Sequence, residues 1–159
     1  MKLTSFTDYS LRVLIYLAAQ PGRRATIAEI ATAFGVSEHH LTKVVHFLGQ
    51  NGWLATVRGK GGGLALAMAP ELIGVGSVVR HTEGLDVVAE CFAEHGGACT
   101  IAPVCRLRGV LREALNAFYA VLDGYTLADL VRNRQALSKV LFFDRVERAP
   151  GPPIAKRAA

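Results

Sequence analysis

The sequence has no long hydrophobic run, although 51% of its residues are hydrophobic. The longest apolar stretch near its start, residues 13–19, is far too short to cross a bilayer. Polar residues interrupt the first ten positions, so the pattern of a secretory signal is missing too. Cysteine is scarce: there are three, an odd number that cannot pair completely as disulfides. These absences predict a cytoplasmic protein without a membrane partner, and 159 residues suffice for one domain or a small domain with an appended element.

Common signatures of enzymes are also missing. The glycine-rich stretch 58–63 lacks the Gly-Lys-Ser/Thr ending of a nucleotide phosphate-binding loop and does not open a helix. No nucleophile paired with a base stands out elsewhere in the sequence. We therefore expect a protein without enzymatic activity.

Positive charge is concentrated in the N-terminal part of the sequence. The whole chain has a formal net charge of +5, and residues 1–60 contain seven Lys and Arg but three Asp and Glu. Such a basic region predicts a polyanionic partner. On charge alone, an ordinary basic surface is an equal alternative.

Three helices are predicted in the first 50 residues, over about 8–19, 26–34 and 37–50. Thr7 or Asp8 is expected to start the first helix. Thr26 and Glu29 have the spacing of a capping box for the second, and Gly35 can adopt the positive φ of the turn before the third. A short turn between two such helices is typical of a helix-turn-helix, with a generic helical hairpin as the alternative.

The third helix and the segment after it have the features of a winged-helix DNA-binding surface. The helix keeps apolar residues on one side and polar or basic residues on the other. Two short strands, 53–57 and 64–68, then flank a basic, glycine-rich tip that can approach a groove. The expected contacts with double-stranded DNA are Ser37, Glu38, His39, His40 and Lys43 in the major groove, and Arg58 and Lys60 from the wing.

A helix over about 72–81 and a long helix over about 105–123 are expected further along the chain. Apolar residues form a heptad-like seam on the long helix: Leu107, Leu111, Ala114, Phe118, Val121 and Tyr125. This seam favours a homodimer, because winged-helix repressors read two DNA half-sites with two subunits. Packing of the seam within one subunit is the alternative. Thr126 is expected to cap one further short helix.

The predicted fold is therefore mainly α, a winged helix-turn-helix domain with a small β-hairpin wing and a long C-terminal dimerisation helix. The predicted divisions are 1–82 for the DNA-binding domain, 83–104 for a cysteine-bearing loop, 105–135 for the dimerisation helix and the short helix after it, and 145–159 for a flexible tail.

The three cysteines, Cys91, Cys99 and Cys105, lie within fifteen residues of one another. Their spacing lacks the paired CxxC knuckles of a zinc ribbon and the close runs of ferredoxins. Three thiolates can still hold an iron–sulfur cluster, zinc or copper(I), with one ligand position left to fill. His81, His95 or a residue from elsewhere could fill that position, and three unligated thiols are the alternative.

Several segments together resemble one known family. They are the start LTSFTDY with Leu11-Arg12, the wing VRGKGGG at 57–63, the three cysteines, and YTLADLV at 125–131. With these motifs, roughly residues 1–135 resemble the NsrR-type nitric-oxide-sensing repressors, part of a bacterial superfamily of winged-helix, often iron–sulfur, regulators. The widest departure is a longer gap between Cys91 and Cys99, which leaves all three thiols present.

The resemblance implies a homodimer with one [2Fe-2S] or [4Fe-4S] cluster per subunit. It implies ligation by Cys91, Cys99 and Cys105 and by Asp8 of the partner subunit, with Arg12 offsetting the cluster's charge. Taken by itself, Asp8 would more simply interact with the helix dipole and pair with Arg12 four residues later.

The resemblance also implies a switch. Nitric oxide would displace Asp8 and disassemble the cluster, and the dimer would then release its inverted-repeat operator. Other signals fit the same architecture, namely iron supply, cluster supply or redox stress. A winged-helix regulator with a structural zinc site is a further alternative.

Overall fold

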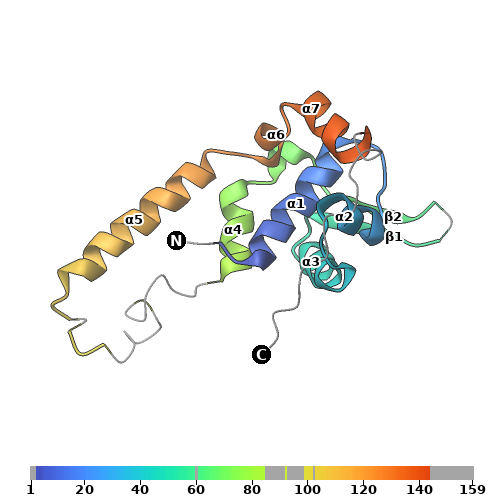
Figure 1. Cartoon of the computed structure of the whole chain (residues 1–159). Coiled ribbons are helices and arrows are strands. Elements are labelled where there is room, and N and C mark those ends of the chain that lie inside the picture. The colour runs from blue at the N-terminus through green and yellow to red at the C-terminus, as the bar shows by residue number, and fades with distance from the viewer. Residues whose placement is uncertain (1–2, 60, 85–91, 93–98, 102, 144–159) are drawn as a thin grey trace, which may run out of the picture.

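The structure is a computed structural model that describes residues 3–59, 61–84, 92, 99–101 and 103–143. Its helices and strands are α1 (Ser5–Ala19), α2 (Ile27–Phe34), α3 (Glu38–Gln50), β1 (Leu54–Val57), β2 (Gly63–Leu66), α4 (Val75–Glu83), α5 (Arg106–Asp123), α6 (Leu127–Leu130) and α7 (Arg134–Ser138). A 3-10 turn (Pro70–Leu72) precedes α4, and a π-helical turn (Lys139–Phe143) follows α7. The predicted mainly helical fold with a small hairpin is confirmed (Figure 1).

Helix α1 lies at the centre of the hydrophobic core. It contacts α2, α3, α4, α6, α7 and β2, which surround it in Figure 1. Val13 and Leu14 on α1 are fully buried, because apolar side chains from the surrounding elements cover both faces of this helix. The largest fully buried partners are Ile30, Leu41, Val44, Leu48, Ile73, Val78, Leu127 and Val131.

The predicted helix-turn-helix is confirmed in α2 and α3. The Thr26 hydroxyl accepts a bond from the Glu29 amide at 3.1 Å, and the Glu29 carboxylate accepts one from the Thr26 amide at 2.6 Å. The bond from the Thr26 amide lowers the pKa of Glu29 below its ordinary value. Gly35 ends α2 with a φ of 64° and turns the chain into α3.

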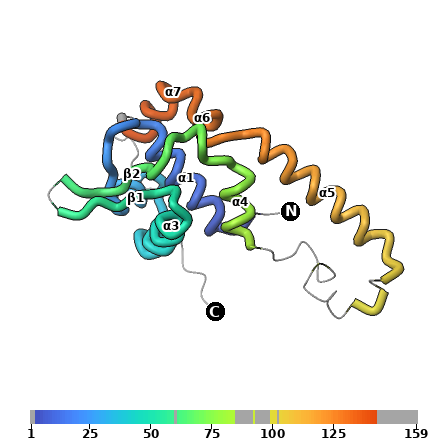
Figure 2. The backbone as a smooth tube through the Cα atoms, turned by 180° about the vertical axis from the view of Figure 1, so that it is seen from behind, coloured from blue at the N-terminus to red at the C-terminus, as the bar shows by residue number. Residues whose placement is uncertain are grey.

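Strands β1 and β2 form an antiparallel hairpin, the wing, that extends from the helical core (Figure 2). Ala25 pairs with Leu64 through two backbone hydrogen bonds of 3.1 and 2.8 Å, which attach the wing to the start of α2. The tip needs glycine, because a Cβ on Gly62 would lie 2.3 Å from the Val57 carbonyl oxygen.

Two predicted helix starts are wrong. Helix α1 begins at Ser5 rather than near Asp8, because the Thr4 hydroxyl caps it by accepting from the Thr7 amide at 3.2 Å. Helix α4 begins at Val75 rather than at Leu72. Residues 73 and 74 are extended there. This segment bonds residues 125–127, with the Val75 amide 2.9 Å from the Tyr125 carbonyl and the Leu127 amide 2.8 Å from the Ile73 carbonyl.

Residues 132–143 contain a turn of helix that the sequence pattern did not predict. Helix α7 and the π-helical turn after it pack on α1, where Leu141 is buried and the Phe142 ring meets Tyr16 edge-on at 4.9 Å. The short helix capped by Thr126 is confirmed as α6, in which Thr126 and Asp129 form a capping box. The predicted tail, 145–159, lies outside the described residues.

Helix α5 projects away from the core (Figures 1 and 2) and is attached to it at its C-terminal end. There the Arg80 guanidinium on α4 donates two bonds to the Asp123 carboxylate and lies 4.5 Å from the centre of the Tyr119 ring. These bonds lower the pKa of Asp123 below its ordinary value. In the part of the chain described, no helix combines the length and the apolar character that crossing a membrane would require.

Candidate nucleic-acid interface and metal centre

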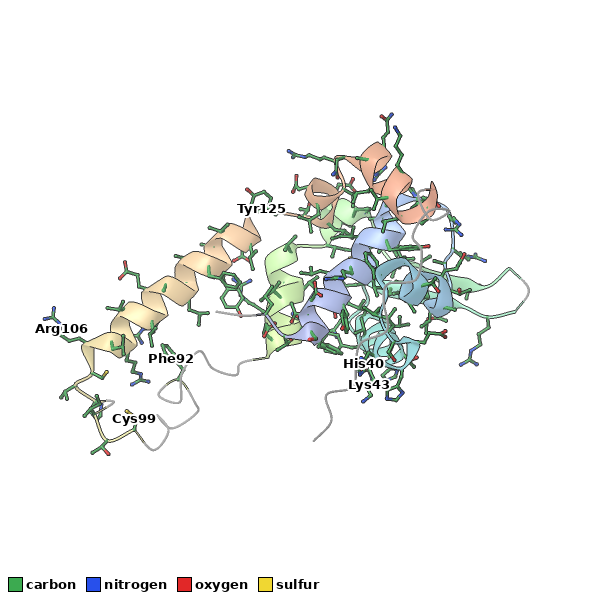
Figure 3. All side chains as sticks on the ribbon, in the orientation of Figure 1. His40, Lys43, Phe92, Cys99, Arg106 and Tyr125 are labelled. Atoms are coloured by element: carbon green, nitrogen blue, oxygen red, sulfur yellow. The ribbon has the colours of Figure 1, made fainter. Side chains whose placement is uncertain are left out.

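The predicted major-groove residues are exposed together on α3. Glu38, His39, His40 and Lys43 are all exposed, whereas Leu41 is buried on the opposite side of the helix. Figure 3 shows His40 and Lys43 pointing away from the core. Acceptors, imidazoles and an ammonium group on one helix face can bond both base edges and phosphates.

Ser37 precedes this face as the N-cap of α3. Its hydroxyl makes no capping hydrogen bond, and the residue is exposed. A hydroxyl at a helix N-terminus can donate to a phosphate oxygen, and the free backbone amides of the first turn can do the same. Ser37 is therefore exposed next to the other predicted contacts, and its contact with DNA stays a prediction.

The wing presents Arg58 to solvent, and Lys60 lies outside the described residues. The sequence reasoning missed Arg24, whose guanidinium donates to the Gly61 carbonyl at 2.9 Å. Arg24 therefore connects the wing tip to the segment that leads into α2. The bond joins residues 37 positions apart, so the sequence around Arg24 gives no local sign of it.

A second feature missed by the sequence reasoning joins α1 to α3. The Tyr9 ring stacks on His40 with centroids 6.3 Å apart, and Phe6 meets Phe47 edge-on at 5.2 Å. Tyr9 follows Asp8 directly, and His40 belongs to the exposed side of α3 that is predicted to contact DNA. The first turns of α1 are therefore in direct contact with this helix.

Asp8 pairs with Arg12 of its own helix in this chain. Arg12 Nη2 lies 2.8 Å from Asp8 Oδ2, and Arg12 Nε donates to Asp8 Oδ1 at 3.0 Å. The two side chains are 44% and 41% exposed, so the pair is accessible and contributes about 0–1 kcal/mol to stability. Such a weak pair leaves the carboxylate open to a stronger partner.

The two described cysteines, Cys99 and Cys105, lie at the N-terminal end of α5, opposite the end that packs on α4. Cys105 is the N-cap of α5 and is half-buried, as is Cys99; both are free thiols, and Cys91 lies outside the described residues. Figure 3 places Cys99 near Arg106, at the end of α5 that projects away from the core. Within one chain, the described thiols at the N-terminal end of α5 therefore lie away from the α1 that carries Asp8 (Figure 1).

The structure describes only one of the two histidines considered as a fourth metal ligand. His95 lies outside the described residues. His81 on α4 is placed by a 2.8 Å contact between its Nδ1 and the Ser77 carbonyl oxygen, and its ring meets Trp53 edge-on at 5.3 Å. These contacts hold His81 against the core. Across the described stretches, no three His, Cys, Asp or Glu side chains gather in a position to hold a metal ion.

The first turn of α5 has an arrangement that fits a bound anion. It contains Arg106 and Arg108 and no acidic residue, although cations at a helix N-terminus oppose the helix dipole. Among the side chains that the structure describes, Arg108 Nε is buried without a hydrogen-bond partner. An anionic group beside Cys105 would offset this charge and accept this donor.

The fold and the exposed face of α3 define a winged-helix transcriptional regulator that binds DNA. The chain belongs to the Rrf2 family, described as "Iron-dependent Transcriptional regulator", which matches residues 3–133. Curated relatives in this family are named transcriptional regulators rather than enzymes.

Two such relatives are similar over most of their length. The chain is 53% identical to the HTH-type transcriptional regulator NsrR of Bacillus subtilis (strain 168), covering 89% of this chain and 97% of the relative. It is 51% identical to the protein of the same name from Geobacillus kaustophilus (strain HTA426), with the same coverage.

Solved structures share the fold. Oxidised CymR of Staphylococcus aureus superposes with a TM-score of 0.65 at 26% identity, covering 83% of this chain and 97% of that one. IscR of T. potens superposes with a TM-score of 0.69 at 24% identity, covering 95% and 94%. The predicted winged-helix regulator fold and the resemblance to NsrR-type proteins are confirmed.

Proposed function

We propose that this chain is a nitric-oxide-responsive repressor that binds an inverted-repeat operator as a homodimer. Each subunit would hold one iron–sulfur cluster with Cys91, Cys99 and Cys105, and Asp8 of the partner subunit would complete the ligand set. Identity of about half to regulators named NsrR supports this function. The first turn of α5 next to Cys105 contains two arginines and no acidic residue, which supports an anionic cofactor at the thiols.

The observation that carries the proposal is the contact between α1 and α3. Asp8 lies between Thr7, which is fully buried, and Tyr9, which stacks on His40 of the DNA-facing helix. A force applied at Asp8 therefore acts on α1, which is in direct contact with the helix α3 that we expect to bind DNA. Helices α1 and α3 pack directly against each other.

The Asp8–Arg12 pair gives the released state a defined structure. When bound, the cluster supplies iron that nitric oxide binds strongly. Asp8, once it no longer ligates, can pair with Arg12 at the 2.8 Å distance seen in this chain. Arg12 also lies 5.7 Å from the centre of the Phe34 ring on α2, so the pair forms against the helix-turn-helix. Ligation and this pairing compete for the same carboxylate.

The dimer would form through α5. This helix has no buried residue in the single chain, and Leu107, Val110 and Val121 are 61%, 60% and 62% exposed. An apolar helix face of this kind marks an interaction surface. A second copy of α5 covering it would bring the thiols of one subunit toward the α1 of the other, as the shared ligand set requires.

The test is an absorbance spectrum and an operator-binding titration on protein purified without oxygen, before and after nitric oxide. We expect an iron–sulfur chromophore with acid-labile sulfide, tight operator binding, and loss of both after nitric oxide. A colourless protein with bound zinc and no labile sulfide would contradict the proposal. So would full operator affinity after stoichiometric nitric oxide.

Asp8→Ala tests the ligand from α1. We expect a changed cluster spectrum and weaker operator binding, with an unchanged apo fold because the Asp8–Arg12 pair contributes only about 0–1 kcal/mol. Glu71→Ala is the matched control, since Glu71 is an exposed acid on the 3-10 turn. A spectrum and affinity like those of the unmodified protein in the Asp8 variant would remove Asp8 from the ligand set.

Iron supply is the second candidate signal, because the family description is iron-dependent. Two treatments distinguish iron supply from nitric oxide as the signal. Under an iron-supply mechanism, chelation during growth abolishes operator binding, whereas brief nitric oxide exposure of the loaded protein leaves it intact.

A further inference from the structure

Arg108 holds a buried hydrogen-bond donor that the chain leaves unsatisfied. Its Nε is shielded from solvent and, among the described side chains, stands out as the buried nitrogen without a partner. Native proteins rarely leave such a donor unpaired, because burial removes its bond to water without replacing it. Arg108 as a whole is only partly buried, so this cost applies to its Nε donor. A partner other than the described residues is therefore expected at this nitrogen.

The position of Arg108 says where that partner lies. Cys105 is the N-cap of α5, and Arg108 follows three residues later within the first turn. Residues three apart share one face of a helix, and helical side chains lean toward the N-terminus. Arg108 and Cys105 therefore occupy the same face at the same end of α5.

Electrostatics favours an anion at that face. The first turn of α5 carries Arg106 and Arg108 and no acid, next to the positive end of the helix dipole. This arrangement disfavours the empty helix end and becomes favourable when negative charge is bound there. A cluster held by three thiolates and one carboxylate carries net negative charge.

We propose that Arg108 is a positioning residue of the cluster site, with its Nε–H donating to a sulfur of the cluster or of its cysteine ligands. This inference rests on the proposed function, because it requires a cluster at the thiols. Hydrogen bonds and positive charge at the sulfurs stabilise the more reduced, more negative state and so raise the reduction potential. Arg108 also lowers the tendency of the cluster to dissociate.

Arg108→Met tests this role, since methionine keeps an unbranched apolar stem and removes every donor. Arg112→Met is the matched control, because Arg112 is exposed on α5 one turn further from Cys105. The measurements are the reduction potential of the reconstituted cluster, the half-life of its absorbance under a chelator, and the melting temperature of the apo protein. Arg108→Lys, which retains the charge, serves as a partial rescue.

In Arg108→Met we expect a lower reduction potential, a cluster half-life shortened several-fold, and an apo melting temperature equal to or above that of the unmodified protein. Arg112→Met should change none of these, and Arg108→Lys should fall between. An unchanged potential and half-life in Arg108→Met would overturn the role. So would an apo protein destabilised as much as the loaded one, which is the result for a purely structural arginine.

These measurements also distinguish a failure of the role inferred for Arg108 from a failure of the proposed function. An unmodified protein that takes up no cluster overturns both. A cluster that forms, responds to Arg108→Met as expected, and yet leaves operator binding unchanged on nitric oxide treatment overturns only the proposed signal.

Discussion

At the residue scale, the side chains predicted to contact DNA are distinct from those that hold the fold together. Lys43 is exposed on α3, and its neighbour Val44 is almost completely buried in the core. Arg58 is likewise exposed on the wing. These positions can therefore be changed to test DNA binding with little effect on stability, which surface substitutions alter by about 0.5 kcal/mol or less.

Lys43→Ala should weaken operator binding and reduce the salt dependence of affinity by about one charge, if the ammonium contacts a phosphate. Arg58→Ala should cost about 1–3 kcal/mol of binding energy if it reads a base edge or a narrow groove. Titrations of a labelled operator at several salt concentrations measure both. Lys139→Ala is the control, an exposed lysine in the turn after α7. Unchanged affinity and salt slope in both variants would refute the assigned surface.

Individual site residues were predictable from sequence to different degrees. Spacing alone drew attention to Cys99 and Cys105, and helical periodicity predicted the exposure of Lys43. Asp8 entered only through resemblance to a family, because its local pattern equally suits the ion pair with Arg12 that the structure contains. Arg108 was missed, since an unsatisfied nitrogen is a property of burial and not of residue order.

At the scale of elements, the attachment of α5 to α4 depends on one close approach. A Cβ on Gly76 would lie 2.0 Å from Asp123 Oδ1 and 3.0 Å from the Asp123 amide nitrogen. Glycine at this position lets the end of α5 reach the Arg80 guanidinium. The direction in which α5 leaves the core is thus fixed by a missing side chain as well as by an ion pair.

Gly76→Ala should therefore destabilise the protein by about 1–3 kcal/mol, the usual cost of overpacking. Gly109→Ala is the matched control: a Cβ there meets nothing within 4 Å, so alanine in this helix should stabilise by about 0.5–1 kcal/mol. Urea unfolding of the apo protein measures both changes. Equal effects of the two substitutions would show that the contact with Asp123 does not constrain α5.

Elements with local signals were predicted well, and elements that depend on tertiary contacts were not. The capping boxes at Thr26 and Thr126 are formed by neighbouring residues, so the sequence contains the whole interaction. The start of α4 depends on pairing with residues 125–127, fifty positions away. Helix α7 is too short to be stable alone and exists through its packing on α1.

At the scale of the whole molecule, the single chain leaves several apolar side chains of α5 exposed among the described residues. Val121 and Leu107 lie near opposite ends of α5, and both are more than half exposed. The remaining described elements pack together around α1. A buried core beside a helix with exposed apolar side chains is expected for a subunit whose helix is covered by a second copy of the chain.

Val121→Glu should convert the dimer to monomer at micromolar concentrations, because a charge would have to be buried between the helices. Asn116→Glu adds the same charge at an exposed polar position of α5 and should leave the dimer intact. Sedimentation velocity measures the mass of each. A Val121→Glu protein that sediments as a dimer would place the interface elsewhere.

Helix α1 both forms the centre of the core and carries Asp8. Val13 and Leu14 have no exposed surface, so this helix cannot slide or unwind without opening the core around it. A force on its first turn would thus tilt the whole DNA-binding domain as a rigid body. In a dimer, where the partner subunit exerts this force on each domain, operator affinity would rise or fall through the angle between the two domains alone. Every contact inside each domain would be kept.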